Sequence, residues 1–393
     1  MVGRSILTFP FALLLFVGCG GADAAGTSPL SRLPDPAGHD PVGSVQGLVT
    51  RLLGASYVDK FAFSTIPADE GLDVFELSMG PGQWQGGAGG PKISIAGNSG
   101  VSLASGLYHY LRHYCNVSVT WGNGGSGDNL KMPDSLPPVE LAIRRRSPVL
   151  YRYAWNVCTV SYSAYPWDWS RWERELDWMA LHGVNLPLSF TGQEAVWQRL
   201  YKQLGLTDEE IQAYFSGPAF LAWQRMNNMR HWGGPLSQDW IEGQLQLQHA
   251  ILARARSFGM WSVLPGFSGR VPSALSRVFP NATLIQNRPW GNFNCSTETC
   301  NSLLSPTDPL FASIGTSYYK LLVSEFGTDH VYNADTYNEM EPTSTDPSFL
   351  TQSNAAVFNA MRAVDNASLY VMQGWLFHES FWSDPSRVKA YLA

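Results

Sequence analysis

An asparagine–glutamate pair is the feature of this chain best suited to chemistry. Asn338 and Glu339 follow the apolar run 330–334, within the sequence Ala-Asp-Thr-Tyr-Asn-Glu-Met-Glu. A glutamic acid that burial or a neighbouring negative charge keeps protonated near neutrality can donate a proton to a departing oxygen. The adjacent amide would then hold a hydroxyl or acetamido group of the ligand. The alternative is that these acids only face the N-terminus of the next helix, whose dipole favours negative charge.

Aromatic residues are a second feature that suits a sugar-binding site. The chain has 15 tryptophans, and an indole ring can stack on the apolar face of a pyranose. Asn156 and Cys158 lie in the run 151–160, which is followed by an aromatic cluster comprising Tyr162, Tyr165, Trp167, Trp169 and Trp172. Because tryptophan also fills protein cores whatever the ligand, core packing remains the alternative for each ring.

Other chemistries find little support in the sequence. The eight histidines are scattered, and His378-Glu379 lacks a second ligand four residues on, so we expect neither a metal nor a cofactor. A net charge of -6 and a pI near 5.8 disfavour a nucleic-acid partner. The basic run 144–146 is interpreted as a solvated hinge. Glu194 follows another apolar run, but with Thr191 it has the spacing of a capping box, which we favour.

Alternating strand and helix patterns from residue 150 onward would position these residues. Five βα units are predicted, with strands at 151–160, 184–190, 260–264, 330–334 and 369–373, which favours a parallel sheet. In a (β/α)8 barrel, reactive side chains lie at the carboxyl ends of the strands, where Asn338 and Glu339 fall. An open doubly wound sheet is the alternative, although no glycine-rich phosphate loop follows the first strand. The predicted fold class is α/β: a small N-terminal α/β domain at 42–140, followed by an incomplete (β/α)8 barrel at 141–393.

The N-terminus has the layout of a secretory signal peptide over residues 1–25, followed by a linker at 26–41. A lipoprotein cleavage site at Cys19 is the weaker alternative, and no apolar window elsewhere is long enough to span a membrane. Export would permit disulfides, so we expect Cys295 and Cys300 to pair, with two free thiols as the alternative. The sequons that would carry glycans in a eukaryotic compartment are at Asn116, Asn281, Asn294 and Asn366.

Ordered blocks of sequence make the chain resemble glycoside hydrolase family 89, the α-N-acetylglucosaminidases. The resemblance covers residues 42 to 393 and is densest between 150 and 377. Its blocks are Tyr-Arg-Tyr at 151–153, Asn-Val-Cys-Thr at 156–159, Trp-Asp-Trp at 167–169, the stretches 172–181 and 217–223, Gly-Gln-Glu-Ala-Val-Trp at 192–197, Phe-Gly-Met at 258–260, Trp-Gly-Asn-Phe-Asn-Cys at 290–295, Phe-Gly-Thr-Asp-His at 326–330, Asn-Glu-Met at 338–340 and Gln-Gly-Trp-Leu-Phe at 373–377.

The resemblance implies an exo-acting, retaining hydrolase that removes terminal α-linked N-acetylglucosamine from glycans such as heparan sulfate. Glu339 matches the family's general acid/base. Residues that match positions in or near the sugar pocket are Asn156, Cys158, Trp290, Asn338 and Trp375. The implied location is the secretory pathway, in a lysosome, a vacuole or outside the cell, and self-association is expected for the full-length family.

The family's nucleophile follows the fifth strand, in a region that has no counterpart here. Glu341, Glu379 and Asp384 are late acids outside the family's nucleophile motif, and the family's all-helical C-terminal domain has no counterpart either. We therefore expect this chain alone to be inactive, with two unpaired strand edges. The alternative is a truncated, non-catalytic isoform that binds carbohydrate as a lectin does.

Overall fold

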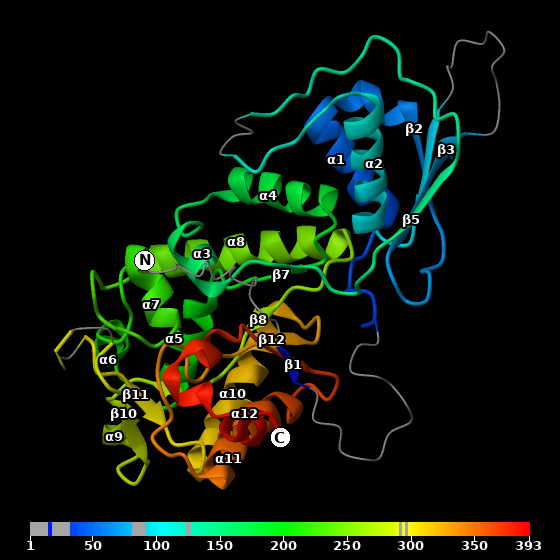
Figure 1. Ribbon diagram of the computed structural model, residues 1–393. Helices are drawn as coiled ribbons and strands as arrows, with labels where there is room; N and C mark the ends of the chain where they lie inside the picture. The colour runs from blue at the N-terminus through cyan, green and yellow to red at the C-terminus, as the bar shows by residue number, and fades with distance from the viewer. Residues whose placement is uncertain (1–14, 18–31, 81–91, 123–126, 291–292, 295–297) are drawn as a thin grey trace, which may run out of the picture.

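A mixed four-stranded sheet covered by two helices begins the structure. The computed structural model describes residues 15–17, 32–80, 92–122, 127–290, 293–294 and 298–393 (Figure 1). The strand order is β2-β4-β3-β5, with β2 and β4 parallel and the other neighbours antiparallel. Helices α1 and α2 bury their apolar residues against this sheet. The elements are α1 (Pro41–Leu53), η1 (Ala55–Lys60), β2 (Phe61–Thr65), β3 (Val74–Met79), β4 (Ile93–Gly97), α2 (Gly100–Tyr114) and β5 (Ile143–Arg146).

The arginine run is part of this sheet, so the hinge interpretation was wrong. Arg144, Arg145 and Arg146 form most of β5, which pairs antiparallel with β3. Arg144 is ion-paired with Asp69 and Glu76, contacts that only the folded sheet brings together. The first sheet therefore reaches beyond the boundary predicted near residue 140.

Five short parallel strands follow in chain order and form the open wall of a barrel. They are β6 (Tyr153–Ala154), β7 (Leu186–Pro187), β8 (Leu264–Pro265), β12 (Val331–Asn333) and β13 (Leu369–Met372). Each pairs with the next, β7 and β8 through a parallel bridge between Leu188 and Val263. The sheet does not close among the described residues, as expected for an incomplete (β/α)8 barrel. One of the two edges predicted to be free is covered, because β1 (Leu15–Val17) pairs antiparallel with β13. These residues lie within the predicted leader 1–25, so removal of the leader would expose that edge again.

Helices cover this wall and are started by local signals. An Asp-Pro pair begins three of them, at Asp308, Asp346 and Asp384, as it begins α1 at Asp40; the carboxylate caps a backbone amide and proline occupies the first turn. The helices of this part are α3 (Val157–Tyr162), α4 (Trp169–Leu181), α5 (Gln193–Gln203), α6 (Asp208–Gln212), η3 (Pro218–Phe220), α7 (Leu221–Arg225), α8 (Gln238–Ser257), α9 (Leu275–Val278), α10 (Pro309–Phe326), α11 (Pro347–Arg362), η4 (Trp375–His378), η5 (Ser380–Ser383) and α12 (Pro385–Tyr391).

Some predicted elements differ from the structure, and each difference has a local cause. The strand predicted at 151–160 stops early because Asn156 caps α3, its side-chain oxygen accepting the amide of Thr159 at 2.7 Å. Helix α4 begins after Asp168, whose side chain accepts the backbone amide of Arg171. Between α2 and β5, Ser118 and Asn129 form a single antiparallel bridge.

A small antiparallel sheet in the long loop after β8 was missed by the sequence analysis. It consists of β9 (Arg270–Val271), β10 (Leu284–Gln286) and β11 (Ser302–Leu304), in the order β10-β11-β9. Its strands have only two or three residues, too few to show a periodic pattern. The sheet fixes the two ends of the segment that contains Trp290.

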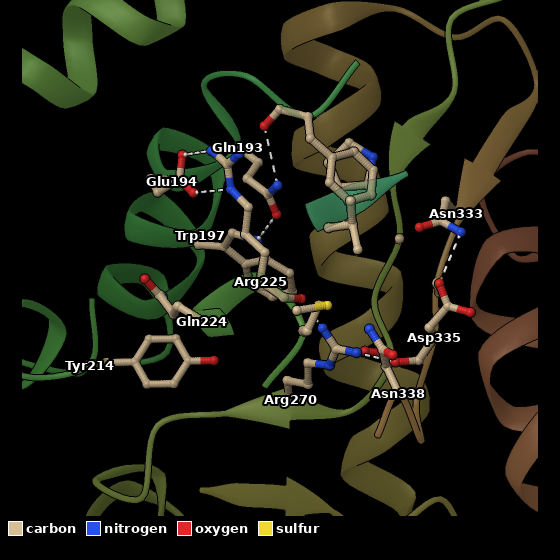
Figure 2. Close-up of a pocket in the computed structure, with 17 residues that line it drawn as sticks. Gln193, Glu194, Trp197, Tyr214, Gln224, Arg225, Arg270, Asn333, Asp335 and Asn338 are labelled. Carbon is tan, nitrogen blue, oxygen red and sulfur yellow. Dashed lines mark hydrogen bonds and ion pairs between the residues drawn. The ribbon is translucent and has the colours of Figure 1, made fainter. Parts of the chain in front are cut away.

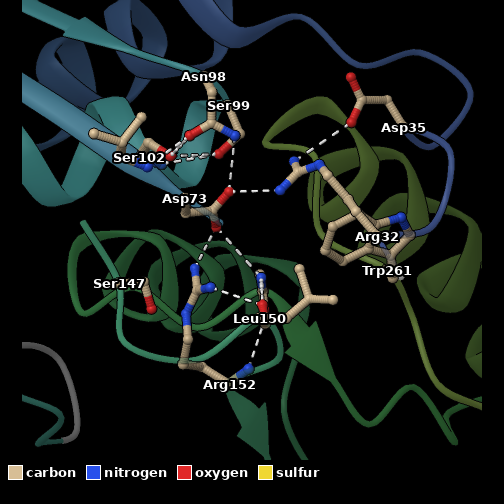
Figure 3. A network of polar contacts seen from close by, with 12 residues as sticks. Arg32, Asp35, Asp73, Asn98, Ser99, Ser102, Ser147, Leu150, Arg152 and Trp261 are labelled. Atoms are coloured by element: carbon tan, nitrogen blue, oxygen red, sulfur yellow. Dashed lines mark hydrogen bonds and ion pairs between the residues drawn. The ribbon is translucent and has the colours of Figure 1, made fainter. Parts of the chain in front are cut away.

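The two parts of the molecule share a buried core and a polar network. Apolar residues of α1 and α2 belong to the same buried cluster as residues of α4, β7 and β12. At the junction, the buried Asp73 binds Arg32 at 2.8 Å and Asn98 at 2.9 Å, and it also pairs with Arg152 of the barrel wall (Figure 3). Among the described residues, no helix is both long and apolar enough to cross a membrane.

Candidate active site

Glu339 lies in the loop after β12 and is held by a tryptophan from a distant segment. The Nε1 of Trp290 donates a hydrogen bond of 2.7 Å to Oε2 of Glu339. Glu339 has a backbone φ of 53°, in the left-handed region that residues other than glycine rarely adopt. The loop thus presents a carboxylate whose orientation is fixed by a partner 49 positions away.

A cavity of about 430 Å³ opens on Glu339. One wall is the segment 286–289, before Trp290, and the other is formed by residues 339–343 together with Glu379. This volume falls within the ~300–1,000 Å³ typical of small-ligand sites. The cavity can therefore accommodate a monosaccharide next to the carboxylate.

Asn338 borders a second, much smaller cavity at the carboxyl ends of the strands (Figure 2). Its volume of about 50 Å³ suits a few water molecules and is too small for a sugar ring. We therefore place the ligand in the cavity that opens on Glu339.

Glu194 lines the smaller cavity, and its contacts there show that the capping role predicted for it was wrong. Helix α5 begins after Gly192, with no capping side chain. Glu194 instead forms two hydrogen bonds of 2.9 Å with Arg225 of α7, and both side chains are at most 6% exposed. Arg225 also donates to Ser161 at 3.1 Å. A buried, bidentate ion pair therefore joins α5, α7 and α3 below the site.

Asp335 and Arg270 organise the turn that leads to Glu339, and the sequence analysis missed both. Burial raises the pKa of Asp335, although the backbone amide of Gln373 donates to it at 3.1 Å. The buried guanidinium of Arg270 donates to the backbone carbonyls of Asp335 and Arg225. An acid directly after a strand was the signal for Asp335, but nothing local identified Arg270.

Comparison with known proteins places the chain in a family. Residues 152–393 match the family described as the α-N-acetylglucosaminidase (NAGLU) tim-barrel domain, and residues 43–138 match the corresponding N-terminal domain. The chain belongs to the α-N-acetylglucosaminidase family. It is 46% identical to human α-N-acetylglucosaminidase over 385 residues, which is 97% of this chain and 48% of that protein. It thus spans about half the length of this relative.

Solved structures of the family agree with the fold. A family 89 glycoside hydrolase from Clostridium perfringens, in complex with 2-acetamido-1,2-dideoxynojirmycin, is 34% identical and superposes with a TM-score of 0.79. The same bacterial protein, with two glutamates replaced by glutamine, gives the same values in complex with its substrate GlcNAc-α-1,4-galactose. In both cases the match covers 89% of this chain and 38% of the other.

Cys158 lies close to Glu339 in this member of the α-N-acetylglucosaminidase family. Burial raises the pKa of its thiol to about 11, and the negative charge of Glu339 is the next cause. The sulfur also lies 3.2 Å from that of Met226. Glu339, Trp290 and Cys158 are thus brought together from three segments.

Asn156 and Trp375 are placed differently from these three. Asn156 is exposed, and its side-chain oxygen is engaged in capping α3. Trp375 begins η4 and is 53% exposed, with its ring 5.3 Å from that of His378. No contact of either residue with Glu339 is seen among the described residues, so their roles in sugar binding stay predictions.

Cysteines and sequons complete the predicted sites. Cys300 is disulfide-bonded, and Cys115 and Cys158 are free thiols. Cys295, the predicted partner of Cys300, lies outside the described residues. The four sequon asparagines, which are all exposed, are Asn116, Asn281, Asn294 and Asn366.

Proposed function

We propose that this chain supplies the acid/base half of a site that hydrolyses terminal α-linked N-acetylglucosamine. The observation that carries the proposal is Glu339 opening on a cavity of about 430 Å³ and held by Trp290. In the reaction, Glu339 donates a proton to the glycosidic oxygen as the bond to the anomeric carbon breaks. The same carboxylate then accepts a proton from the water that releases the sugar.

A retaining reaction also needs a nucleophilic carboxylate about 5 Å from the acid. The bacterial relative with two glutamates replaced, which is described with its substrate, supports a requirement for two such groups. Glu341 and Glu379 line the cavity, but Glu341 is 36% exposed, bound to Ser380 at 3.3 Å and 3.9 Å from Arg288. We assign neither as the nucleophile.

Activity and binding assays separate the two parts of this proposal. The 393 residues, produced by themselves, should release no p-nitrophenol from its α-N-acetylglucosaminide. They should still bind the methyl α-glycoside, and Trp290→Ala should weaken that binding, because the carboxylate loses its orientation. Release that disappears in Glu339→Gln would contradict the expected inactivity, and a chain that binds no glycoside would contradict the site.

A carbohydrate-binding protein without catalysis is the second candidate. The aromatic residues around Trp290 favour it, because they would bind a sugar whether or not a nucleophile is present. Preference for the α-glycoside over the β-glycoside would support the hydrolase family's specificity. Equal binding of both anomers would favour a lectin-like role.

Heparan sulfate as the physiological glycan, and a lysosomal, vacuolar or extracellular location, are further parts of the proposal. The leader-like N-terminus and the exposed sequons support export. A protein made in eukaryotic cells should lose mass when its N-glycans are removed enzymatically. An unchanged mass would contradict passage through the secretory pathway.

A further inference from the structure

The arginine run of β5 borders a cavity of about 250 Å³, which we call the junction cavity (Figure 3). It lies between β3, β5, α2 and the turn that follows α4, where the N-terminal sheet meets the barrel wall. None of its lining residues also lines the cavity that opens on Glu339. The ionisable side chains that line the junction cavity are Arg145, Arg146, Arg152, Asp73 and His182.

The one carboxylate of the junction cavity is already balanced by two cations. Asp73 is bound by Arg32 at 2.8 Å and is also paired with Arg152, and these arginines outweigh burial so that its pKa is lowered. Burial lowers the pKa of His182 from 6.5, so its ring is neutral at pH 7. Asp73 therefore does not offset the charge of a further arginine in the cavity.

Arg145 is that further arginine. Among the described residues, none forms a hydrogen bond or an ion pair with its guanidinium, whereas Arg144 and Arg146 are both paired with acidic side chains. Side chains alternate along a strand, so Arg145 lies on the same face as Phe75, its partner in β3, whose ring is 5.7 Å from that of His109 in α2. Burial is the main cause of the lowered pKa of His109, and the charge of Arg145 contributes. The guanidinium therefore lies on the α2 side of β5 and is available to a ligand.

Serine hydroxyls line the same cavity and offer acceptors to a ligand. Ser102, Ser105 and Ser147 each donate the hydroxyl proton to a protein oxygen, at 2.8, 3.4 and 2.7 Å. A hydroxyl has one proton to donate and two lone pairs, so these side chains can still accept hydrogen bonds. A guanidinium beside such acceptors matches a ligand that has an oxyanion and several hydroxyl groups.

We propose that the junction cavity binds a sugar that carries a sulfate or phosphate ester. Arg145 binds the oxyanion, and the hydroxyls of the sugar donate to the serines. A volume of about 250 Å³ is just below the ~300 Å³ at which small-ligand sites begin, so the cavity suits one sugar residue. The inference does not depend on Glu339 or on hydrolysis. The competing explanation is that Arg145 is only solvated.

Titration calorimetry on the 393-residue chain tests the junction cavity. Glucose 6-sulfate and glucose 6-phosphate are compared with glucose at pH 7 in about 150 mM salt, which screens loose surface attraction. Each ester should bind at least about tenfold more tightly than glucose, because a charged hydrogen bond is added. These probes have no acetamido group, so they avoid the specificity proposed for the site at Glu339. Glu339→Gln should therefore bind them as the parent chain does.

Variants locate the binding at Arg145. Arg145→Gln should weaken the binding of both esters about tenfold and leave that of glucose unchanged. Arg145→Lys keeps the charge but loses the planar fork, so it should retain part of the affinity. Arg144→Gln is the matched control, because Arg144 belongs to the same strand and carries the same charge but does not line the cavity. It should bind both esters normally.

The outcomes separate the junction cavity from surface charge and from the site at Glu339. Esters that bind no more tightly than glucose, or an equal loss in Arg144→Gln and Arg145→Gln, would overturn the proposal. Ester binding that disappears in Glu339→Gln would overturn it as well. A preference for the sulfate would assign the ligand to a sulfated glycan, and a preference for the phosphate to a phosphorylated sugar. If Arg145→Gln unfolds, Arg145→Lys and displacement of the ester by inorganic sulfate decide.

Discussion

Glu339, the acid that we propose, has an unfavourable backbone conformation. A φ of 53° costs a residue that has a Cβ about 1–3 kcal/mol, and it persists only where the surroundings impose it. The hydrogen bond from Trp290 and the buried Asp335 in the preceding turn supply that constraint. The carboxylate is therefore positioned at the expense of local stability, as is common where a loop carries chemistry.

Replacing Glu339 by glycine should reveal this local strain. Glu339→Gly and Glu339→Ala both lose the bond from Trp290, but only glycine adopts a positive φ without steric cost. The glycine variant should be more stable than the alanine variant by about 1 kcal/mol in urea unfolding. At Glu341, which has no positive φ, the alanine variant should be more stable than the glycine variant. An alanine variant that is the more stable of the pair at both positions would contradict backbone strain at Glu339.

The thiol of Cys158 should react slowly at neutral pH. Because burial and the charge of Glu339 raise its pKa from 9.0 to about 11, its thiolate fraction at pH 8 falls roughly 100-fold. Alkylation by iodoacetamide in a Cys115→Ser background should accelerate about tenfold per pH unit until pH approaches 11. Labelling at pH 8 as fast as that of the unfolded chain would contradict this environment.

Helix α4 shows how one element joins the two parts of the molecule. Glu175 on its buried face accepts a 2.7 Å hydrogen bond from Nε1 of Trp121 and pairs with Arg171 at 2.9 Å. The guanidinium of Arg171 also stacks 3.9 Å from the ring of Trp167. Neighbouring Arg174 is paired with Asp128. Glu175 thus faces two arginines of its own helix and one tryptophan of the preceding segment.

Glu175 should make stability depend on pH. Burial raises its pKa from 4.5 to about 7, against the opposing effects of Arg171 and Trp121. The folded state then holds a proton that the unfolded state has lost, so this contribution is fully present below pH 4.5 and disappears as pH rises through 7. It amounts to up to about 3 kcal/mol.

Urea unfolding at several pH values tests this expectation. Between pH 4.5 and 7, the free energy of unfolding should fall less steeply in Glu175→Gln than in the parent chain. Subtracting the two curves removes the other titrating groups. Parallel curves would show that Glu175 is charged throughout this range.

At the scale of the whole molecule, the N-terminal sheet and the barrel wall behave as one packed body. Their shared buried cluster contains Leu107 of α2, Leu176 of α4 and Val331 of β12. Burial alone would raise the pKa of Asp73 at the junction, but Arg152 and Arg32 outweigh it and the pKa is lowered. Its stabilising effect is therefore present above pH 3.8 and is lost as pH falls through the lowered value.

The two parts should unfold in one transition. Far-ultraviolet and near-ultraviolet circular dichroism should give coincident urea curves, because neither part can open without exposing the shared core. Asp73→Asn leaves Arg32 and Arg152 without a buried counter-charge and should lower the midpoint of both curves together, at a cost of about 3 kcal/mol. The exposed Asp59→Asn is the control, with no change expected. A variant in which only one curve shifts would show two independent domains.

Local signals in the sequence determined the helices and the order of the strands, and they singled out Glu339 as the acid that we propose. The Asp-Pro starts at Asp308 and Asp346 and the apolar run before Glu339 act over a few residues, so a pattern can reveal them. Family resemblance added Trp290 and Cys158. The capping role of Glu194 and the hinge at Arg144 were wrong because both patterns compete with ion pairs between distant segments.

Only the tertiary structure decided which side chains meet. Trp290 reaches Glu339, Arg225 pairs with Glu194 and Trp232 contacts Phe293 across long stretches of chain. Such contacts depend on the summed path of every intervening helix and loop, which no local pattern encodes. The sequence therefore singled out Glu339 as the proposed acid, and the fold determined which residues hold it.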